Sequence, residues 1–235
     1  MNAQTIGNRF IAVSLLVLGV ILAAYLSAQA QTTGNAGSGT SQLSAQIVAQ
    51  GTSRGAIACA RCHGYDGSSD GSGAFPALAG QSAQYLANQL RHYASGERQN
   101  AIMVSIAKGL TEDELQAVAQ YYASAHPPSI SRHPSAADLV ARGKEYALVG
   151  DASARVQNCI SCHGPNGEGQ PPDVPFLAGQ YGAYIKLQLL MFQKGYRKSV
   201  QMQDVAHNLP TPHVEAVAAY FDQLQLPSQA KNQGK

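Results

Sequence analysis

The pentapeptide Cys159-Ile160-Ser161-Cys162-His163 has a twin, Cys59-Ala60-Arg61-Cys62-His63, that begins 100 residues earlier. Both match C-x-x-C-H, a pattern typical of covalent haem c attachment. Two thiols three residues apart lie on the same side of one helical turn, so each can form a thioether with one vinyl group of the porphyrin. The histidine that follows then offers a neutral imidazole to the iron. We therefore expect two covalently bound haem c groups, each forming a large part of the core of a small domain.

All four cysteines of the chain lie in these two motifs. A redox-active C-x-x-C pair of the thioredoxin type would need a βαβ setting and would leave both histidines unexplained. A single zinc ion held by four thiolates would need its two cysteine pairs about 15 to 20 residues apart. The observed separation is far larger, so haem attachment is the interpretation that accounts for all six residues.

The composition fits a globular protein of two domains whose cores need a cofactor. The 235 residues are 45% hydrophobic but only 7% aromatic and 13% charged, and tryptophan is absent. Apolar side chains alone would make thin cores for two domains, and two buried porphyrins would supply the missing apolar bulk. The formal net charge of +2 excludes no class of partner, and nothing in the sequence points to nucleic acid.

The N-terminus resembles an export segment. Residues 1–30 contain Arg9, an apolar run from Phe10 to Leu26, and the ending Ala28-Gln29-Ala30, which suits a signal peptidase. The apolar run approaches the length of a membrane span, so a cleaved signal peptide and an uncleaved membrane anchor both stay open. Either one implies that the folded part is exported, as a free protein or tethered to the membrane. Residues 31–41, rich in Gly, Ser and Thr, are expected to be a flexible tether, and the lack of a nearby cysteine excludes a lipoprotein anchor.

The folded part divides into two similar halves. Three prolines within 127–134 forbid a continuous helix, so we place a linker at 127–135 between a first domain at 42–126 and a second at 136–228, with a tail at 229–235. After the haem motifs the halves match at an offset of 99 residues, which indicates one duplicated unit. The matched pairs include Leu78-Ala79-Gly80-Gln81 with Leu177-Ala178-Gly179-Gln180, Pro76 with Pro175, Tyr85 with Tyr184, Arg98 with Arg197 and Met103 with Met202.

Periodicity and capping residues predict helices throughout. We expect middle helices at 82–95 and 181–194, terminal helices from Thr111 and at 213–224, and leading helices at 42–50 and 136–148, the last capped by Ser135. In the first half, Cys59 follows Gly51 by eight residues. In the second half, Cys159 follows Gly143 by sixteen residues. This difference predicts an inserted loop near residues 150–153.

The sixth ligand of each iron separates an electron carrier from a catalyst. Met103 and Met202 each follow their haem histidine by about 40 residues, occupy the same place in the repeat and fall in stretches expected to be irregular. We predict that both thioethers bind iron, because His/Met ligation makes a six-coordinate haem of relatively high potential. Met191 lies inside an apolar helix and is expected only to fill the core.

Other side chains are expected to support the haems. The carbonyls of Pro76 and Pro175 are placed to fix the second ring nitrogen of the axial histidines, with a plain turn proline as the alternative. Two arginines and two tyrosines either pair with haem propionates or are ordinary solvated arginines and core tyrosines: Arg98, Arg197, Tyr85 and Tyr184. The remaining histidines have no repeat partner and are expected in surface or loop positions: His92, His126, His133, His207 and His213.

Taken together, these motifs resemble the di-haem cytochrome c4 family. C-x-x-C-H-G, P-x-L-A-G-Q, Y-x-x-x-Q-L, G-x-R and a methionine follow one another twice, over residues 42–226. The resemblance implies an all-α fold of two tandem class I cytochrome c domains related by a pseudo-twofold, preceded here by the N-terminal apolar helix. It also implies haems close together across the domain interface, and a soluble or membrane-attached carrier in the bacterial periplasm.

The expected function is electron transfer, with no enzyme activity. Single electrons would come from a membrane respiratory donor such as a quinol-oxidising complex and go to a terminal oxidase or reductase, so the partners are redox proteins. One alternative is a permanently bound di-haem subunit of a periplasmic dehydrogenase or oxidase. A di-haem peroxidase is less favoured, because it needs one open iron and the two matched methionines argue against that.

Overall fold

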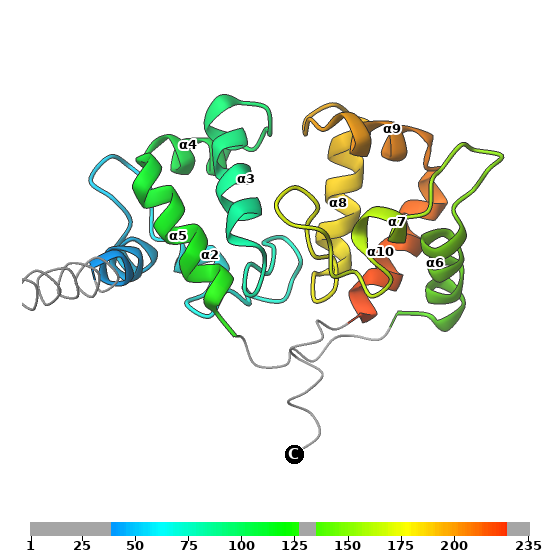
Figure 1. Ribbon diagram of the computed structural model, residues 1–235, viewed down its shortest axis with the longest axis horizontal. Helices are drawn as coiled ribbons and strands as arrows, with labels where there is room; N and C mark the ends of the chain where they lie inside the picture. The colour runs from blue at the N-terminus through cyan, green and yellow to red at the C-terminus, as the bar shows by residue number, and fades with distance from the viewer. Residues whose placement is uncertain (1–38, 127–134, 225–235) are drawn as a thin grey trace, which may run out of the picture. The chain divides into compact units, whose positions relative to one another are not determined.

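Helices joined by glycine-rich turns build both halves of the chain (Figure 1). The computed structural model describes residues 39–126 and 135–224. The first half holds a helical segment at 39–50, then α2 (Ala60–His63), α3 (Ala83–Ser95), α4 (Ala101–Lys108) and α5 (Glu112–Ser124). The second half holds α6 (Ala137–Val149), α7 (Ile160–His163), α8 (Gly182–Gln193), α9 (Val200–Asn208) and α10 (Thr211–Gln223). Only isolated β-bridges accompany these helices in the described residues, so the predicted all-α fold is confirmed for them.

Several predicted segments lie outside the described residues. They are the export segment at 1–30, most of the tether at 31–41, nearly all of the linker at 127–135 and the tail at 229–235, together with His133. Residues 39–41, the last of the expected tether, are helical and exposed. Within 39–126 and 135–224, no helix combines the length and the apolarity that crossing a membrane requires. Whether the apolar run at 10–26 belongs to a cleaved signal peptide or to a membrane anchor therefore stays open.

Capping side chains determine where helices of the first half begin. Thr111 accepts a hydrogen bond from the Glu114 backbone N–H while the Glu114 side chain accepts one from the Thr111 N–H, so α5 begins with a capping box. The first turn of α5 is acidic, which suits the positive end of the helix dipole. Ser82 caps α3 by accepting from the Tyr85 N–H. These local signals explain why the middle and terminal helices lie where the sequence predicts them.

α4 and α9 correct a prediction, because the stretches that carry Met103 and Met202 are helical and not irregular. Asn100 accepts hydrogen bonds from the N–H groups of Ile102 and Met103, and Ser199 accepts one from Met202. These N-caps start helices that are only about two turns long. A helix this short shows too few repeats of the 3.6-residue period to be recognised in the sequence.

The prediction of an inserted loop before the second haem motif is also wrong, because the two halves differ there by only one residue. Gly51 and Gly150 end the leading helices in the same way, with φ of +81° and +78°, and each N–H bonds to the carbonyl four residues earlier. The counterpart of Gly51 is therefore Gly150 and not Gly143, and the second half is longer here by a single residue. The N-cap of α6 is Ala136, and no side chain caps this end of the helix. The predicted cap by Ser135 is therefore wrong.

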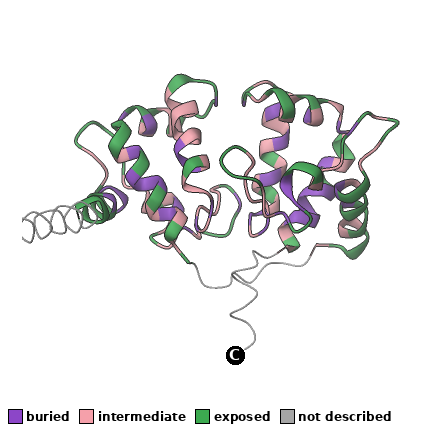
Figure 2. Ribbon diagram, viewed as in Figure 1, coloured by how far each residue is buried: buried purple, intermediate pink, exposed green. Residues whose placement is uncertain are grey.

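The terminal helix of each half forms the centre of its core. α10 contacts α6 and α8, and α5 contacts α3. Buried residues, drawn purple in Figure 2, run along α5 and α10. Tyr122 and Phe221, at matched positions of the repeat, are almost fully buried, and the Tyr122 hydroxyl donates to the Gly64 carbonyl at 3.0 Å. Burial of one such aromatic ring contributes about 1.5–3 kcal/mol to folding.

α6 and α10 cross so closely at Gly143 that no side chain fits. A Cβ atom built on Gly143 would lie 1.9 Å from the carbonyl oxygen of Ala216 and 2.9 Å from the Cβ of Tyr220. The matching position of the first half is Ser44, which is buried. The first half therefore accommodates a small side chain where the second half requires glycine.

Replacement of Gly143 with alanine is expected to lower the free energy of unfolding by about 1–3 kcal/mol, because the new methyl group meets the rigid backbone of α10. Denaturant unfolding of the haem-loaded protein, followed by circular dichroism, measures this change. Ala141→Ser, on the exposed face of the same helix, is the control and should change the free energy by less than about 0.5 kcal/mol. Equal stability of the two variants would contradict the close crossing.

Candidate functional site

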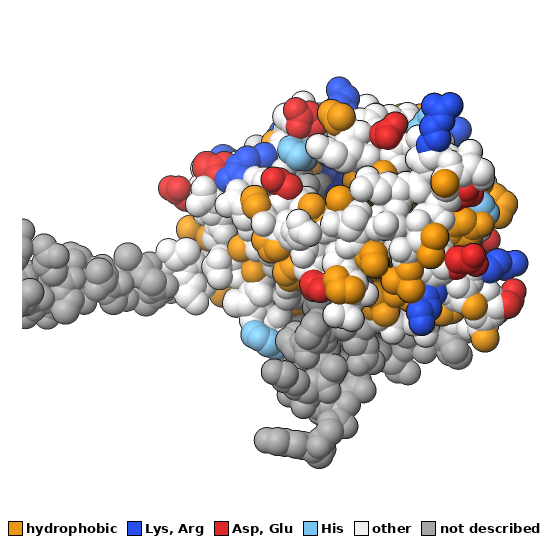
Figure 3. All heavy atoms as spheres, turned by 45° about the vertical axis from the view of Figure 1, so that its right-hand side comes forward, with side chains coloured by type: hydrophobic (Ala, Val, Ile, Leu, Met, Phe, Trp, Pro, Cys, Tyr) orange, Lys and Arg blue, Asp and Glu red, His pale blue; other side chains and the backbone are white. Residues whose placement is uncertain are grey.

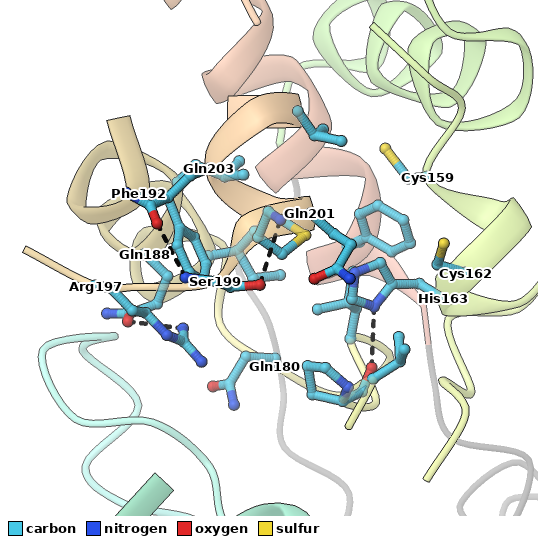
Figure 4. Close-up of a pocket in the computed structure, with 18 of the residues that line it drawn as sticks. Cys159, Cys162, His163, Gln180, Gln188, Phe192, Arg197, Ser199, Gln201 and Gln203 are labelled. Atoms are coloured by element: carbon cyan, nitrogen blue, oxygen red, sulfur yellow. Dashed lines mark hydrogen bonds between the residues drawn. The ribbon is translucent and has the colours of Figure 1, made fainter. Parts of the chain in front are cut away.

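Each C-x-x-C-H motif forms a single helical turn that ends at its histidine. The histidine N–H bonds to the carbonyl of the first cysteine, at 3.0 Å for His63 and 2.9 Å for His163. Gly164, with φ of +77°, then turns the chain away from the helix axis. In Figure 4 the sulfur atoms of Cys159 and Cys162 lie on the side of α7 that faces the cavity. This is the arrangement that two thioether links to one porphyrin need.

The alternatives for the cysteines find no support in the structure. No disulfide bond joins any of the four cysteines. Burial raises the pKa of the Cys59 and Cys159 thiols to about 11, which disfavours the thiolates that a zinc site needs. In the part of the chain that the structure describes, no three His, Cys, Asp or Glu side chains come together as a metal site. A four-thiolate zinc site is therefore not formed.

Both motif histidines are buried, and each is held by a proline carbonyl. Nδ1 of His63 lies 3.2 Å from the carbonyl oxygen of Pro76, and Nδ1 of His163 lies 3.1 Å from that of Pro175. Burial lowers the pKa of both imidazoles, so they are neutral, which is the form that binds a metal. With Nδ1–H donating to the carbonyl, Nε2 is the nitrogen left for iron. The role of these histidines as ligands stays a prediction.

A cavity of about 1250 Å³ lies beside the second motif (Figure 4). Ligand pockets usually measure about 300–1,000 Å³, so this one has room for a bulky planar cofactor. Cys159, Cys162, His163 and Met202 all line it. Two thiols, a neutral imidazole and a thioether are the donor set of a haem c, so the residues present fit that group. The apolar lining of the cavity includes Leu177, Ile185, Leu189, Phe192, Val217 and Phe221 of the second half, and Leu78 and Leu86 of the first.

The two predicted methionine ligands occupy equivalent places. Met103 and Met202 are each the third residue of a short helix, α4 or α9, and both are half-buried. Met202 also packs against the core of the second half. Met191, in α8, is half-buried and does not line the cavity. Thioether ligation by the first two stays a prediction that this equivalence supports.

Arg98 and Arg197 are buried, with 5% and 8% of their surface exposed, so the alternative of solvated arginines is wrong. Each guanidinium stacks on a ring of its own half at 4.6 Å, Arg98 on Tyr93 and Arg197 on Phe192. The two halves therefore bury a cation in the same way at matched positions of the repeat.

Each of these arginines also reaches into the opposite half, and the described residues from Ser44 onward form one compact unit. Arg98 donates to the Tyr184 hydroxyl, and Arg197 donates to the Tyr85 hydroxyl. The side-chain oxygens of two glutamines, Gln89 and Gln188, accept from both guanidinium groups. All four acceptors are uncharged, and no carboxylate of the described residues pairs with either arginine. Two buried cations without an anion are costly, so this cluster suits negatively charged groups such as haem propionates.

A second link between the halves was missed in the sequence. Gln81 and Gln180, the last residues of the repeated L-A-G-Q, are buried. Gln81 bonds to the backbone of Phe176, and Gln180 bonds to the backbone of Ala77. The sequence did contain one signal for this link, because a polar residue, glutamine, stands at the same position in both copies of the repeat.

One of the remaining histidines departs from the expected surface or loop position. His213 lies in α10 and is half-buried, with its ring stacked on Tyr146 at 3.8 Å and Nε2 2.6 Å from the tyrosine hydroxyl. His207 and His126 are exposed, and His92 is half-buried in α3. None of these lies in a C-x-x-C-H motif.

Comparisons with known proteins agree with this geometry. The Cytochrome c family model matches residues 48–125 and again residues 141–225. The chain is 36% identical over 169 residues to the thiosulfate dehydrogenase electron acceptor of Thiomonas intermedia (strain K12), covering 71% of this chain and 78% of that protein. It is 31% identical over 182 residues to cytochrome c4 of Pseudomonas aeruginosa, covering 75% and 88%.

Two solved structures are similar as well. Reduced recombinant cytochrome c4 from Pseudomonas stutzeri superposes with a TM-score of 0.65 at 30% identity, over 71% of this chain and 93% of that one. Thiosulfate dehydrogenase (TsdBA) from Marichromatium purpuratum superposes with a TM-score of 0.72 at 36% identity. That match covers 79% of this chain but only 40% of the solved chain, so our chain spans less than half of that protein.

We expect the mature protein to carry two covalent haems, which intact-protein mass spectrometry measures directly. Cys162→Ser should leave the second half with a single, weaker thioether, because only Cys159 can then attach to the porphyrin. Cys62→Ser is the matched variant and should weaken attachment in the first half alone. An intact mass that corresponds to one haem or none would contradict the assignment of both motifs.

Proposed function

Because this chain belongs to the cytochrome c family and has two such domains in tandem, we propose that it is a periplasmic di-haem carrier of single electrons. It receives them from a respiratory donor at the membrane, such as a quinol-oxidising complex, and delivers them to a terminal oxidase or reductase. The observation that supports this proposal is the duplication of a complete site, in which a C-x-x-C-H motif, a proline carbonyl and a methionine recur in the same order. The chain is an electron carrier and not an enzyme.

In this proposal the residues of each half have separate tasks. The bound haem supplies an iron that gains and loses one electron. The two cysteines hold the porphyrin, and the buried histidine binds iron through Nε2 while the proline carbonyl keeps its ring oriented. The methionine thioether would be the second protein ligand of that iron and would keep other ligands away, which would separate this protein from a peroxidase. The buried Arg98 and Arg197 bind the propionates.

A second candidate donor is a dehydrogenase. A thiosulfate dehydrogenase electron acceptor from Stutzerimonas stutzeri (strain A1501) is 36% identical over 174 residues, like the Thiomonas protein described above. The names of these relatives favour a role as the acceptor for a thiosulfate dehydrogenase, either as a free carrier or as a bound subunit. The haem chemistry is the same in both roles, and only the lifetime of the complex differs.

The exposed surface favours brief encounters with partners. Val200, at 84% exposure, lines the cavity together with the exposed charged residues Lys198 and Asp204. On the face shown in Figure 3, hydrophobic side chains gather near the middle, with acidic and basic ones around them. An apolar centre with a charged rim is typical of small, short-lived redox contacts.

Reduction of the native protein by two donors in parallel tests the proposed function. One donor is a quinol-oxidising complex with quinol, and the other is a thiosulfate dehydrogenase with thiosulfate. We expect stopped-flow absorbance to show reduction of both haems, with a rate constant that falls as salt rises because charges guide the encounter. A complex with the dehydrogenase that survives gel filtration at high salt favours the bound subunit. Failure of both donors to reduce the protein would contradict the proposal.

Met202→His should lower the potential of the second haem by about 0.1 V or more while keeping it six-coordinate and low-spin, because imidazole favours ferrous iron less than a thioether does. Met103→His should do the same for the first haem. Redox titration followed by absorbance and electron paramagnetic resonance measures both effects. Unchanged potentials in both variants would exclude these methionines as ligands.

Alanine variants provide the control for this assignment. Met103→Ala and Met202→Ala should each open one ferrous iron to carbon monoxide, whereas Met191→Ala should change only stability. Rapid carbon monoxide binding by the unaltered protein would contradict ligation by both methionines.

A further inference from the structure

Gln81 and Gln180 make the same pair of hydrogen bonds across the two halves. Oε1 of Gln180 accepts from the Ala77 N–H at 3.0 Å, and its Nε2 donates to the Ala77 carbonyl at 2.9 Å. Oε1 of Gln81 accepts from the Phe176 N–H at 3.1 Å, and its Nε2 donates to the Phe176 carbonyl at 3.0 Å. Each side chain thus pairs with a backbone segment of the other half as a neighbouring β-strand would.

The peptide group that each glutamine contacts is the one that holds a haem histidine. The Ala77 N–H and the Pro76 carbonyl belong to a single peptide unit, and that carbonyl oxygen lies 3.2 Å from Nδ1 of His63. One continuous chain of hydrogen bonds therefore runs from the His63 ring through this peptide to Gln180 of the second half.

The second site repeats the arrangement with the halves exchanged. The Phe176 N–H and the Pro175 carbonyl form one peptide unit, whose oxygen lies 3.1 Å from Nδ1 of His163. Its N–H donates to Gln81, a residue of the first half. No residue of the second half replaces Gln81 at this N–H, because a backbone N–H has a single proton to donate.

The glutamine oxygens are fixed in place. Oε1 of Gln81 also accepts from the Ser82 N–H at 3.0 Å, and Oε1 of Gln180 accepts from the Tyr181 N–H at 3.0 Å. Both glutamines are buried, with 8% and 9% of their surface exposed. A buried amide that accepts two backbone N–H groups on its oxygen and donates to a carbonyl from its nitrogen has one favourable orientation.

We propose that Gln81 and Gln180 are positioning residues that set the redox potential of the haem in the opposite half. This inference rests on the proposed function, since it takes His63 and His163 as iron ligands. A hydrogen bond to the N–H of a peptide polarises the group and makes its carbonyl a stronger acceptor. A stronger acceptor at Nδ1 makes the imidazole a more basic ligand, which favours ferric iron and lowers the potential.

Loss of one glutamine should therefore raise the potential of the haem across the interface. Gln180→Leu should raise that of the first haem, and Gln81→Leu that of the second, with the haem in the same half as the substitution changed much less. We expect the electron distribution between the two haems to shift by about threefold to tenfold, where tenfold corresponds to about 59 mV. The shift should have opposite directions in the two variants.

Redox titration of the haem-loaded variants, with the haems distinguished by proton NMR, measures the two potentials separately. The same spectra report the Nδ1–H resonance of each histidine, which should move in the half opposite the substitution. Gln84→Leu is the control, because Gln84 is exposed on α3 and bonds only within that helix, to Asn88. If a leucine variant loses haem, Gln180→Asn or Gln81→Asn takes its place. Asparagine keeps the amide group, but its shorter side chain does not reach the backbone of the opposite half.

Equal shifts of both potentials, or a shift confined to the haem of the altered half, would overturn the inference, because a general loosening of the interface predicts those results. Unchanged potentials in both glutamine variants would overturn it as well. In each of these cases the unaltered protein still titrates as two covalent haems, so the proposed function stands. Unaltered protein with fewer than two haems would instead defeat both.

Discussion

The hydrogen bond from a buried histidine to a proline carbonyl is the interaction on which each half of this protein depends. It holds the ring of His63 or His163 at the end of a one-turn helix and occupies Nδ1, so that under the proposed function Nε2 is the nitrogen that binds iron. The surrounding chain brings proline and histidine together. The Leu78 N–H bonds to the Gly67 carbonyl at 2.8 Å, and an equivalent bond follows the second motif, so each loop is tied back close to its proline.

The contact between the two halves contains buried polar side chains. Arg98 and Arg197 place two positive charges in this contact. The side chains that accept their hydrogen bonds are glutamines and tyrosines, which are uncharged. Buried charges without a counterion destabilise a fold. Under the proposed function the haem propionates supply the missing negative charge, so the cofactors would complete the contact between the domains as well as their two cores. Assembly of the interface and loading of haem would then depend on each other.

The duplicated halves have stayed alike around the haem sites and have diverged elsewhere. Where the second half stacks His213 on Tyr146, the first half has Glu114, which caps α5 and forms an ion pair with Arg54. The difference between Gly143 and Ser44 at the helix crossing is of the same kind. Residues beside the haem must meet fixed distances to a rigid porphyrin, whereas the far sides of the helices need only fill space with matching volumes. The two copies could therefore change independently there.

The sequence by itself was enough for the all-α fold, the duplication, the two haem motifs and the prolines that the histidines contact. Those features are encoded locally, in the spacing of residues along a few turns of chain and in the repetition of that spacing. The sequence did not predict that Met103 and Met202 lie in helices. Each of these helices starts at an N-cap and is too short to show the 3.6-residue period of apolar side chains. Only the tertiary structure decided that Gln81, Gln180 and the two buried arginines act across the interface. Their partners lie far away in the chain and are chosen by how two folded surfaces meet, which no local pattern encodes.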